Sequence, residues 1–436
     1  MLRYYLNLAL RSLKRNPVLT TLMVLAIGFG VAASMTTYAV FRAVSGDPIP
    51  NKSAQLFKPQ IDNWGPRNGR ADGEPPDAMD YTDAVALMNA HKAARQTVLY
   101  PIGQSLIPDD ASGKPIGVVG YATYTDFFQM FDVPFQYGGG WPASDDAKRG
   151  RVIVITAKLN QRLFGGSNSV GKSVNMDGRN YRIVGVTRAW NPQPRYYDAA
   201  NGSSFGSAPQ IWIPFTHAID QQIGTFGNNN CYKASDPGWD GWLRSECIWL
   251  SYWAELPDAS AVAAYKSYLN GYAAEQQRAG RFDWAPNVRL RNVMQWMDYL
   301  HVVPTETRVS LLVSLGFLLV CLVNTVGLLL AKFLRRAPEI GVRRALGASR
   351  REIYTQFLTE AAIVGLTGGT LGILLTAAGV LGIGLVFEPQ IARLARVDVA
   401  LVALTLLAAI VATVIAAVYP TWRASTVQPA WQLKSN

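Results

Sequence analysis

Hydrophobic residues are concentrated in four stretches that contain no Asp, Glu, Lys or Arg. These stretches are Asn16–Phe41, Val309–Ala331, Ala361–Phe387 and Val399–Trp422. Each is longer than the ~20 apolar residues that an α-helix needs to cross the hydrocarbon core of a bilayer. Because a buried helix of a water-soluble domain is seldom uncharged for so long, the pattern predicts transmembrane helices at 16–41, 309–331, 361–387 and 399–422.

Ahead of the first stretch, Leu2, Leu6, Leu10 and Leu13 recur at helical spacing, with basic residues off that face. This pattern predicts an amphipathic helix at residues 1–15, lying on the membrane surface. The alternative is that these residues simply begin the first span. A cleaved signal peptide fits poorly, because its apolar core usually has roughly 7–15 residues.

Residues 42–308 separate the first two stretches and have ordinary globular composition. So long a segment must be a folded domain. Short strand and helix signals run through it, including a hairpin at 174–186 that turns at Asp177-Gly178. We expect a hairpin-rich subdomain at about 150–218, and a stalk helix that starts near 294–300 and leads into the second span.

The predicted fold class is therefore an α-helical membrane protein with four transmembrane helices. A large α+β extracytoplasmic domain is inserted between helices 1 and 2.

Basic residues set the orientation of these spans. The chain has 41 Lys and Arg against 30 Asp and Glu, a formal charge of +11. They cluster before the first stretch (Arg3, Arg11, Lys14, Arg15) and between Lys332 and Arg351. The positive-inside rule places both clusters in the cytoplasm, which puts 42–308 outside and the tail at 423–436 inside.

Arg393 and Arg396 fall on the outer side against this rule, but the two clusters are much larger. The middle of the chain has no basic stripe interleaved with aromatic residues, so nucleic acid is not an expected partner.

Residues Gly166–Ser173 satisfy the G-x-x-x-x-G-K-[ST] pattern of a nucleotide-binding P-loop. A working P-loop follows a strand and opens a helix, so that backbone amides cradle phosphates. Here the motif follows a predicted helix and opens a hairpin, on the outer side of the membrane. We interpret it as an ordinary loop.

Other chemistry-bearing residues give no enzyme signature. The three histidines form no two-histidine helical motif, and the chain has no C-x-x-C or G-x-S-x-G. The adjacent acids Asp109-Asp110 and Asp145-Asp146 are interpreted as solvated loop tips. We expect a non-catalytic chain without a metal or a cofactor of its own.

Cys231 and Cys247 flank an Asn-, Gly- and Trp-rich insert near 220–250, in the segment expected outside. An oxidising compartment favours a disulfide between them over two free thiols, with ~3 kcal/mol from closing the loop.

The segment 332–356 between spans 2 and 3 is predicted to hold a short helix and a sharp corner. Pro338 can begin the helix, Gly347 suits its C-terminal end, and Ser349 with Glu352 forms a capping-box pattern that starts the next helix. A short exposed helix at a membrane surface has little to bury alone. It needs a partner or the lipid interface.

This segment also carries a family resemblance. The run Glu339-Ile340-Gly341-Val342-Arg343-Arg344-Ala345-Leu346-Gly347-Ala348-Ser349 resembles the signature of the FtsX/MacB permease family. Residues 321–324 and 328–331, the N-terminal 10–17 and the C-terminal 420–432 are similar to the family's pattern. Residues 165–186 resemble the hairpin region of its periplasmic core. The Cys-flanked insert is the poorest match.

The resemblance implies a bacterial inner-membrane permease subunit, multi-pass, with its large domain in the periplasm. It implies that the 339–347 segment is a coupling helix that docks on a cytoplasmic ABC ATPase, where ATP and Mg²⁺ would bind. The chain begins directly with the amphipathic helix, so a separate ATPase is expected. ATP-driven movement would pass to the periplasmic domain by mechanotransmission and drive export or extraction of substrate.

The implied partners are a second permease chain, identical or a diverged sister, a periplasmic adaptor, an outer-membrane duct and the lipid membrane. Two other roles stay open: release of lipoproteins, and regulation of a cell-wall hydrolase in the manner of FtsX.

Small residues in the spans would permit close helix approach. Ala26, Gly30 and Ser34 form such a face on the first span, and Gly365, Gly368, Gly369 and Gly372 on the third. Asn324 is a candidate for a hydrogen bond between helices. These contacts could join two chains or could pack helices within one chain.

Overall fold

The computed structural model describes residues 8–9, 11–13, 15–69, 71–108, 114–201, 204–386 and 397–425. The chain divides into two compact units. One comprises residues 46–302, and the other is formed by the chain before and after it.

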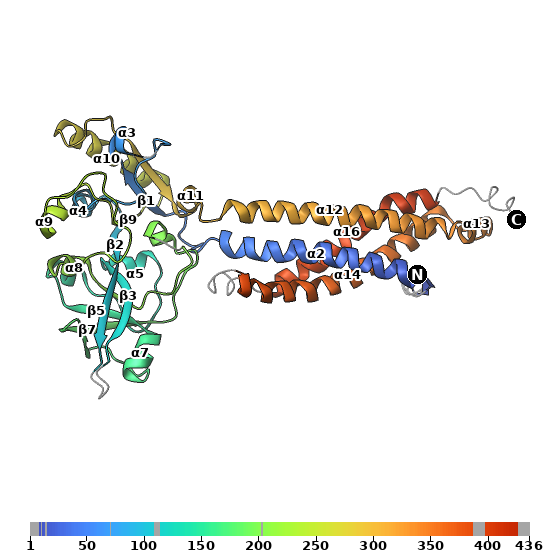
Figure 1. Ribbon diagram of the computed structural model, residues 1–436, viewed down its shortest axis with the longest axis horizontal. Helices are drawn as coiled ribbons and strands as arrows, with labels where there is room; N and C mark the ends of the chain where they lie inside the picture. The colour runs from blue at the N-terminus through green and yellow to red at the C-terminus, as the bar shows by residue number, and fades with distance from the viewer. Residues whose placement is uncertain are drawn as a thin grey trace. The chain divides into compact units, whose positions relative to one another are not determined.

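Long helices form the unit outside 46–302 (Figure 1). They are α2 (Pro17–Ser45), α12 (Thr305–Leu334), α14 (Arg350–Val386) and α16 (Val399–Ser425). Within the described residues these four helices are long and apolar enough to cross a membrane. α2 contacts the other three, and α14 packs along α16.

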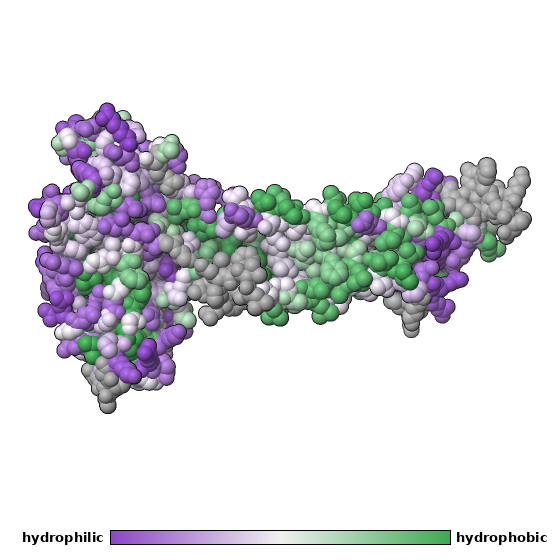
Figure 2. Space-filling view, in the orientation of Figure 1, coloured by the Kyte–Doolittle hydropathy of each residue, from purple (hydrophilic) through white to green (hydrophobic). Residues whose placement is uncertain are grey.

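Apolar side chains cover the visible surface along these helices, and hydrophilic ones gather at the end that carries the short helix α13 (Ala337–Ala345), as Figure 2 shows. This distribution is what a bilayer-spanning bundle requires, because apolar side chains are stable in the hydrocarbon core and charged ones are not.

The helix bounds differ from the predicted spans in informative ways. α14 starts at Arg350, so the third span and the segment just before it are one continuous helix. Residues 11–13 and 15 are helical, and Asn16 forms a bend just before α2. Leu2, Leu6 and Leu10 lie outside the described residues, as do Arg393, Arg396 and the tail from 426 onward.

The unit at 46–302 is built on one mixed, ten-stranded sheet, in the order β10-β1-β9-β2-β3-β8-β5-β7-β4, with β6 pairing β2 and β7. Its strands are β1 (Leu56–Ile61), β2 (Arg95–Ile107), β3 (Ile116–Thr123), β4 (Phe135–Gly138), β5 (Val152–Thr156), β6 (Ser173–Met176), β7 (Arg179–Thr187), β8 (Ile211–Pro214), β9 (Ser251–Glu255) and β10 (Val288–Asn292).

Short helices connect these strands. They are α3 (Gly65–Asn68), α4 (Tyr81–Ala90), α5 (Asp126–Met130), α6 (Ala143–Ala147), α7 (Ala157–Phe164), the 3₁₀ helix η1 (Tyr196–Asn201), α8 (Phe215–Asp220), α9 (Gly238–Leu243), α10 (Ala259–Arg278) and α11 (Val293–Tyr299).

The predicted hairpin is confirmed. β6 and β7 pair antiparallel, with Met176 opposite Arg179, and both turn residues have positive φ, 47° at Asp177 and 82° at Gly178. Residues 150–218 do not form a separate sheet, because β8 lies between β3 and β5 and so joins this region to the rest.

The predicted stalk helix is wrong in its continuity. α11 ends at Tyr299, His301 adopts a left-handed conformation, and α12 starts only after Pro304. Proline has no backbone N–H to donate to a preceding helical turn, and it fits best just ahead of or inside a new helix start. The segment is therefore two helices, not one.

Candidate functional site

The segment between α12 and α14 folds as the local sequence predicts. Pro338 lies in the first turn of α13, and Gly347, just after the helix end, has a φ of 98° that favours glycine. The Ser349 hydroxyl accepts from the amide of Glu352, whose carboxylate in turn accepts from the Ser349 amide at 2.8 Å. This reciprocal capping box starts α14 and fixes the corner.

A buried ion network lies beneath α13. Lys332 near the end of α12 pairs with Glu360 of α14, and both side chains are 0% exposed. Arg336 approaches the same carboxylate at 3.2 Å. Ser12 donates its hydroxyl to Glu360 at 2.6 Å and accepts from Arg336 at 2.7 Å. The network thus ties the N-terminal helical residues to both helices that flank α13.

Glu339 extends this network into α13. Its carboxylate accepts from Arg343 at 2.7 Å and lies 3.3 Å from Arg336. Arg343 also donates to Gln356 of α14 at 2.9 Å. Partial burial works to raise the pKa of Glu339, but the hydrogen bond and charge of Arg336, with further help from Arg343, hold that pKa below its usual value. Glu339 is therefore ionised at neutral pH.

The apolar residues of α13 face two ways. Ile340 and Gly341 are buried, and Ile340 belongs to a cluster with Leu13, Phe333 and Phe357. Val342 and Leu346 point outward and are 53% and 83% exposed. Inward packing and the salt bridges therefore hold the short helix in place, and an apolar surface is left open on its other side.

The residues predicted for the coupling helix lie together in the structure, but their side chains have different roles. Glu339 and Arg343 stabilise the segment internally, Val342 and Leu346 are presented to solvent, and Arg344 is half-buried. Sequence reasoning missed Ser12, Lys332, Arg336, Gln356 and Glu360. A usable signal existed for two of them, because Lys332 and Glu360 are the charged residues that bound the second and third uncharged stretches.

The small residues of the spans pack helices within this chain. A Cβ added at Gly30 would lie 3.0 Å from Cys321 of α12, and one at Gly368 would lie 2.9 Å from Ile27 of α2. Gly372 approaches the backbone of α2 at Gly28. Asn324 differs: it is exposed on α12 and has no hydrogen-bond partner within the described part of the chain.

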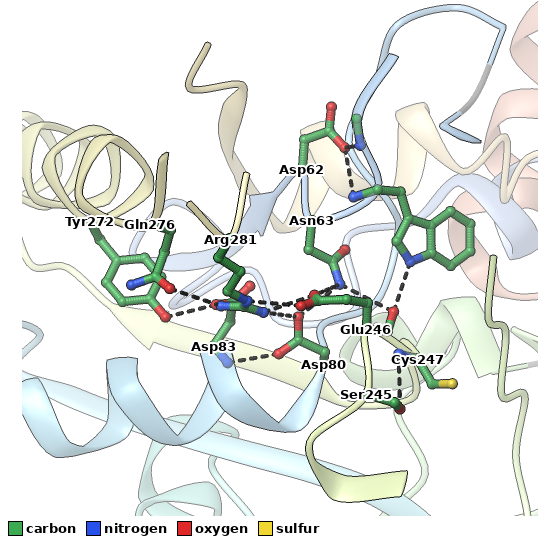
Figure 3. Close-up of polar contacts among 12 residues, drawn as sticks. Asp62, Asn63, Asp80, Asp83, Ser245, Glu246, Cys247, Tyr272, Gln276 and Arg281 are labelled. Carbon is green, nitrogen blue, oxygen red and sulfur yellow. Dashed lines mark hydrogen bonds and ion pairs between the residues drawn. The ribbon is translucent and has the colours of Figure 1, made fainter. Parts of the chain in front are cut away.

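A second charged cluster is buried in the unit at 46–302. The guanidinium of Arg281 points between three carboxylates, as Figure 3 shows. It pairs with Asp80 at 2.8 Å, with Glu246 at 2.9 Å and with Asp83. Asn63 donates to Asp80 at 2.7 Å. The cluster joins the N-terminus of α4, the loop after α10 and the Cys-flanked insert.

Burial and the neighbouring Asp83 raise the pKa of Asp80 well above its ordinary value, although Arg281 opposes this. Burial also works to raise the pKa of Glu246, but its hydrogen bonds from Arg281 outweigh that and lower it. The cluster is a structural device. Among the described residues, no group of three or more His, Cys, Asp or Glu side chains is placed so that it could hold a metal ion.

Next to Glu246, Cys247 forms a disulfide with Cys231, with their Cα atoms 4.3 Å apart. We expect the double variant Cys231→Ser/Cys247→Ser to have a free energy of unfolding that is ~3 kcal/mol lower than that of the wild type. Without the disulfide, the unfolded chain of the insert has more conformational freedom. Denaturant unfolding followed by tryptophan fluorescence measures this. A reductant should destabilise the wild type but not the double variant, and equal responses would contradict a stabilising bond.

Asp146 is not the solvated loop residue that was expected. It is buried on α6 and accepts from the indole of Trp141 at 2.8 Å and the amide of Thr125 at 3.0 Å. The expectation failed because Trp141 and the chain at Thr125 fold over it. Burial raises its pKa to about 7, against the lowering effect of these two hydrogen bonds. Asp109 and Asp110 lie outside the described residues.

The raised pKa of Asp146 has a measurable consequence for stability. Between about pH 4 and 7 the folded chain holds a proton here that the unfolded chain has lost, so stability falls as pH rises, by up to ~1.4 kcal/mol per unit. We expect Asp146→Asn to flatten this slope. Asp145→Asn, at the half-buried neighbouring position, should keep it, and parallel slopes in all three proteins would contradict the assignment.

The P-loop-like motif has the geometry of a loop. It follows α7 and leads directly into β6 of the hairpin, and its lysine, Lys172, lies 5.1 Å over the ring of Phe164. No helix begins after the motif to present amides to a phosphate, so residues 166–173 do not have the geometry of a phosphate cradle.

Together these features define a class: a membrane protein with four spanning helices, an α/β domain between the first two, and a short helix held between the second and third. Comparison with known families is specific. Residues 20–272, more than half of the chain, match the MacB-like periplasmic core domain, and residues 311–429 match the FtsX-like permease C-terminal domain. The chain belongs to the MacB/FtsX-type permease family.

Individual relatives agree with this membership. The chain is 24% identical over 387 residues, 86% of its length, to the macrolide export ATP-binding/permease protein MacB of Salmonella typhi. It is 28% identical over 275 residues to the protein of that name from Burkholderia cenocepacia. These alignments cover 52% and 34% of the relatives, so the chain spans about half or less of their length.

Among solved structures, the periplasmic region of MacB from Actinobacillus actinomycetemcomitans aligns with 58% of this chain at 14% identity. The alignment covers 95% of that structure, with a TM-score of 0.37.

Proposed function

We propose that this chain is the permease subunit of an ABC transporter in a bacterial inner membrane. The large domain would lie in the periplasm, and a separate cytoplasmic ATPase would bind ATP and Mg²⁺. Nucleotide-driven movement of that ATPase reaches the periplasmic domain by mechanotransmission and drives export or extraction of substrate from the periplasm. Family membership supports the permease assignment.

The observation that carries the coupling assignment is the outer surface of α13. Val342 and Leu346 are more than half exposed on a helix that salt bridges and Ile340 hold firmly against the bundle. A rigid helix with exposed apolar side chains is suited to transmit force to a docked protein, because burial of those side chains stabilises the contact. The ATPase is the partner that we propose for this surface.

We expect Leu346→Asp to weaken binding of the ATPase at least tenfold and to abolish permease-dependent stimulation of ATP hydrolysis. A buried carboxylate without a partner costs more than 1.4 kcal/mol, and that energy corresponds to a factor of ten. The measurement is ATPase activity of the reconstituted complex, with pull-down of the partner. Leu346 makes no buried contact, so the permease itself should stay folded.

Arg351→Ala is the matched control, because Arg351 is an exposed residue of the same cytoplasmic segment. It should leave stimulation unchanged. Glu339→Ala and Arg343→Ala should reduce stimulation indirectly, by loosening α13. If the Leu346→Asp variant still stimulated ATP hydrolysis fully, the assignment of α13 as the docking site would be wrong.

The second permease chain is proposed to pair through α12. Its outward side chains are apolar over several turns, and Asn324 lies among them. An amide in a hydrocarbon core is costly without a hydrogen bond, so a facing chain that supplies one is favoured over lipid.

Crosslinking of substrate to the periplasmic domain would distinguish export through an adaptor and outer-membrane duct from lipoprotein release or control of a hydrolase.

A further inference from the structure

A hollow of about 460 Å³ lies at the cytoplasmic end of the helical unit, beside the ion network and lined in part by members of that network. Its lining comes from the residues just before α2, the end of α12 and the start of α13. The lining residues are Ser12, Arg15, Asn16, Arg335, Arg336, Pro338 and Glu339.

Positive charge dominates this hollow. Three arginines face one carboxylate, Glu339, which is already shared between Arg336 and Arg343. Arg15 and Arg335 are exposed, and neither has an ion-pair partner within the described ranges of the chain. A group with two or more acceptor oxygens and a negative charge would satisfy both guanidinium groups, which are suited to bidentate contacts with phosphate.

The surface next to the hollow is apolar. Val18 and Leu22 on the first turns of α2 are 71% and 47% exposed, and Leu334, which precedes Arg335, is 46% exposed. A soluble anion would gain nothing from these side chains. A molecule with a phosphate at one end and hydrocarbon at the other would use both parts of the surface.

We propose that this hollow binds the phosphate headgroup of an anionic phospholipid of the inner leaflet, with its acyl chains along the start of α2 and the end of α12. Basic pockets at the cytoplasmic ends of membrane helices are suited to such headgroups. Arg336 contributes to the hollow and to the pairs with Glu339 and Glu360, so a bound phosphate also changes the charge that holds α13 in place.

The test uses the full chain in nanodiscs of phosphatidylcholine with fluorescently labelled phosphatidylglycerol as the probe. We expect Arg15→Gln/Arg335→Gln to weaken labelled-lipid binding roughly thirtyfold, from about 1 kcal/mol per basic residue near the surface and 1.4 kcal/mol per factor of ten. Arg350→Gln/Arg351→Gln is the matched control. It removes two exposed arginines of the same segment, outside the hollow, and should change binding less than twofold.

The remaining arms decide the source of the phosphate. Unlabelled phosphatidylglycerol should displace the probe from the wild type, and phosphatidylcholine should not. Equal losses in both double variants would overturn the site in favour of general surface charge. Full displacement of the probe by millimolar inorganic phosphate would assign the hollow to free phosphate and overturn the lipid as its proper occupant. The competition experiment uses only the wild-type protein, so it tests the proposal even if a variant misfolds.

Discussion

Glu360→Ala is expected to open the helical unit, with a loss of about 3–5 kcal/mol of stability. Glu360 is the carboxylate that both Lys332 and Arg336 approach, and it and Lys332 are completely buried. Removing one partner of a buried ion pair leaves an uncompensated charge in a medium of low dielectric constant, and this costs far more than the pair itself contributes.

The chain carries its own probe for this effect. Cys321 is buried on α12 against Gly30, and it is the one cysteine outside the disulfide. Its rate of labelling by a thiol reagent reports how often the helices separate. For the opening that exposes Cys321 and that the network opposes, a loss of about 3–5 kcal/mol predicts labelling that is faster by a factor of roughly 150 to 4,000.

The control for this experiment is Lys332→Met/Glu360→Gln, which removes both buried charges together. Arg336 keeps its contact with Glu339, so the rate of Cys321 labelling should return most of the way to the wild-type rate. Wild-type labelling in Glu360→Ala would show that the buried network does not hold the helices together. Equally fast labelling in the double variant would assign the effect to lost packing, not to the unpaired charge.

Arg281→Ala should have a comparable effect on the periplasmic-type domain, again about 3–5 kcal/mol. It leaves Asp80, Asp83 and Glu246 close together without their cation. Tryptophan fluorescence follows unfolding of this domain well, because ten of the twelve tryptophans of the chain lie in it. Arg278→Ala, an exposed arginine at the end of α10, is the control and should change little.

The pH dependence gives a second, independent test of that cluster. Acid protonates the orphaned carboxylates and removes their repulsion, so the deficit of Arg281→Ala should shrink as the pH falls toward 5. Arg281→Lys should fall between wild type and alanine, because an ammonium restores the charge but not the fork of donors. A deficit that is constant with pH would indicate lost packing alone.

Sequence reasoning succeeded where the cause of the structure is local. The uncharged stretches predict the spans because twenty apolar residues have few other stable environments. Pro338, Gly347 and the Ser349–Glu352 pair predict the corner around α13 because each acts within one helical turn. The Asp177-Gly178 turn is predicted for the same reason.

It failed where partners are distant in the chain. Ser12 and Glu360 are separated by 348 positions, and Arg281 and Asp80 by 201. Neither pairing has a periodic signal in one sequence. The order of strands in the sheet could not be predicted for the same reason, because β8 lies between β3 and β5 although it is distant from β3 in the sequence. The stalk prediction failed for another reason: Pro304 was a local signal that outweighs the helical pattern of residues 294–300.

The pairing of β1 with β10 bears on how the protein is made. The strand that opens the domain, Leu56–Ile61, has its antiparallel partners at Val288–Asn292. A ribosome must therefore synthesise more than two hundred further residues before that edge can close, and non-local pairing of this kind is slow. Until then one edge of β1 has no partner in the nascent chain, and this edge is where chaperone protection during biogenesis would matter most.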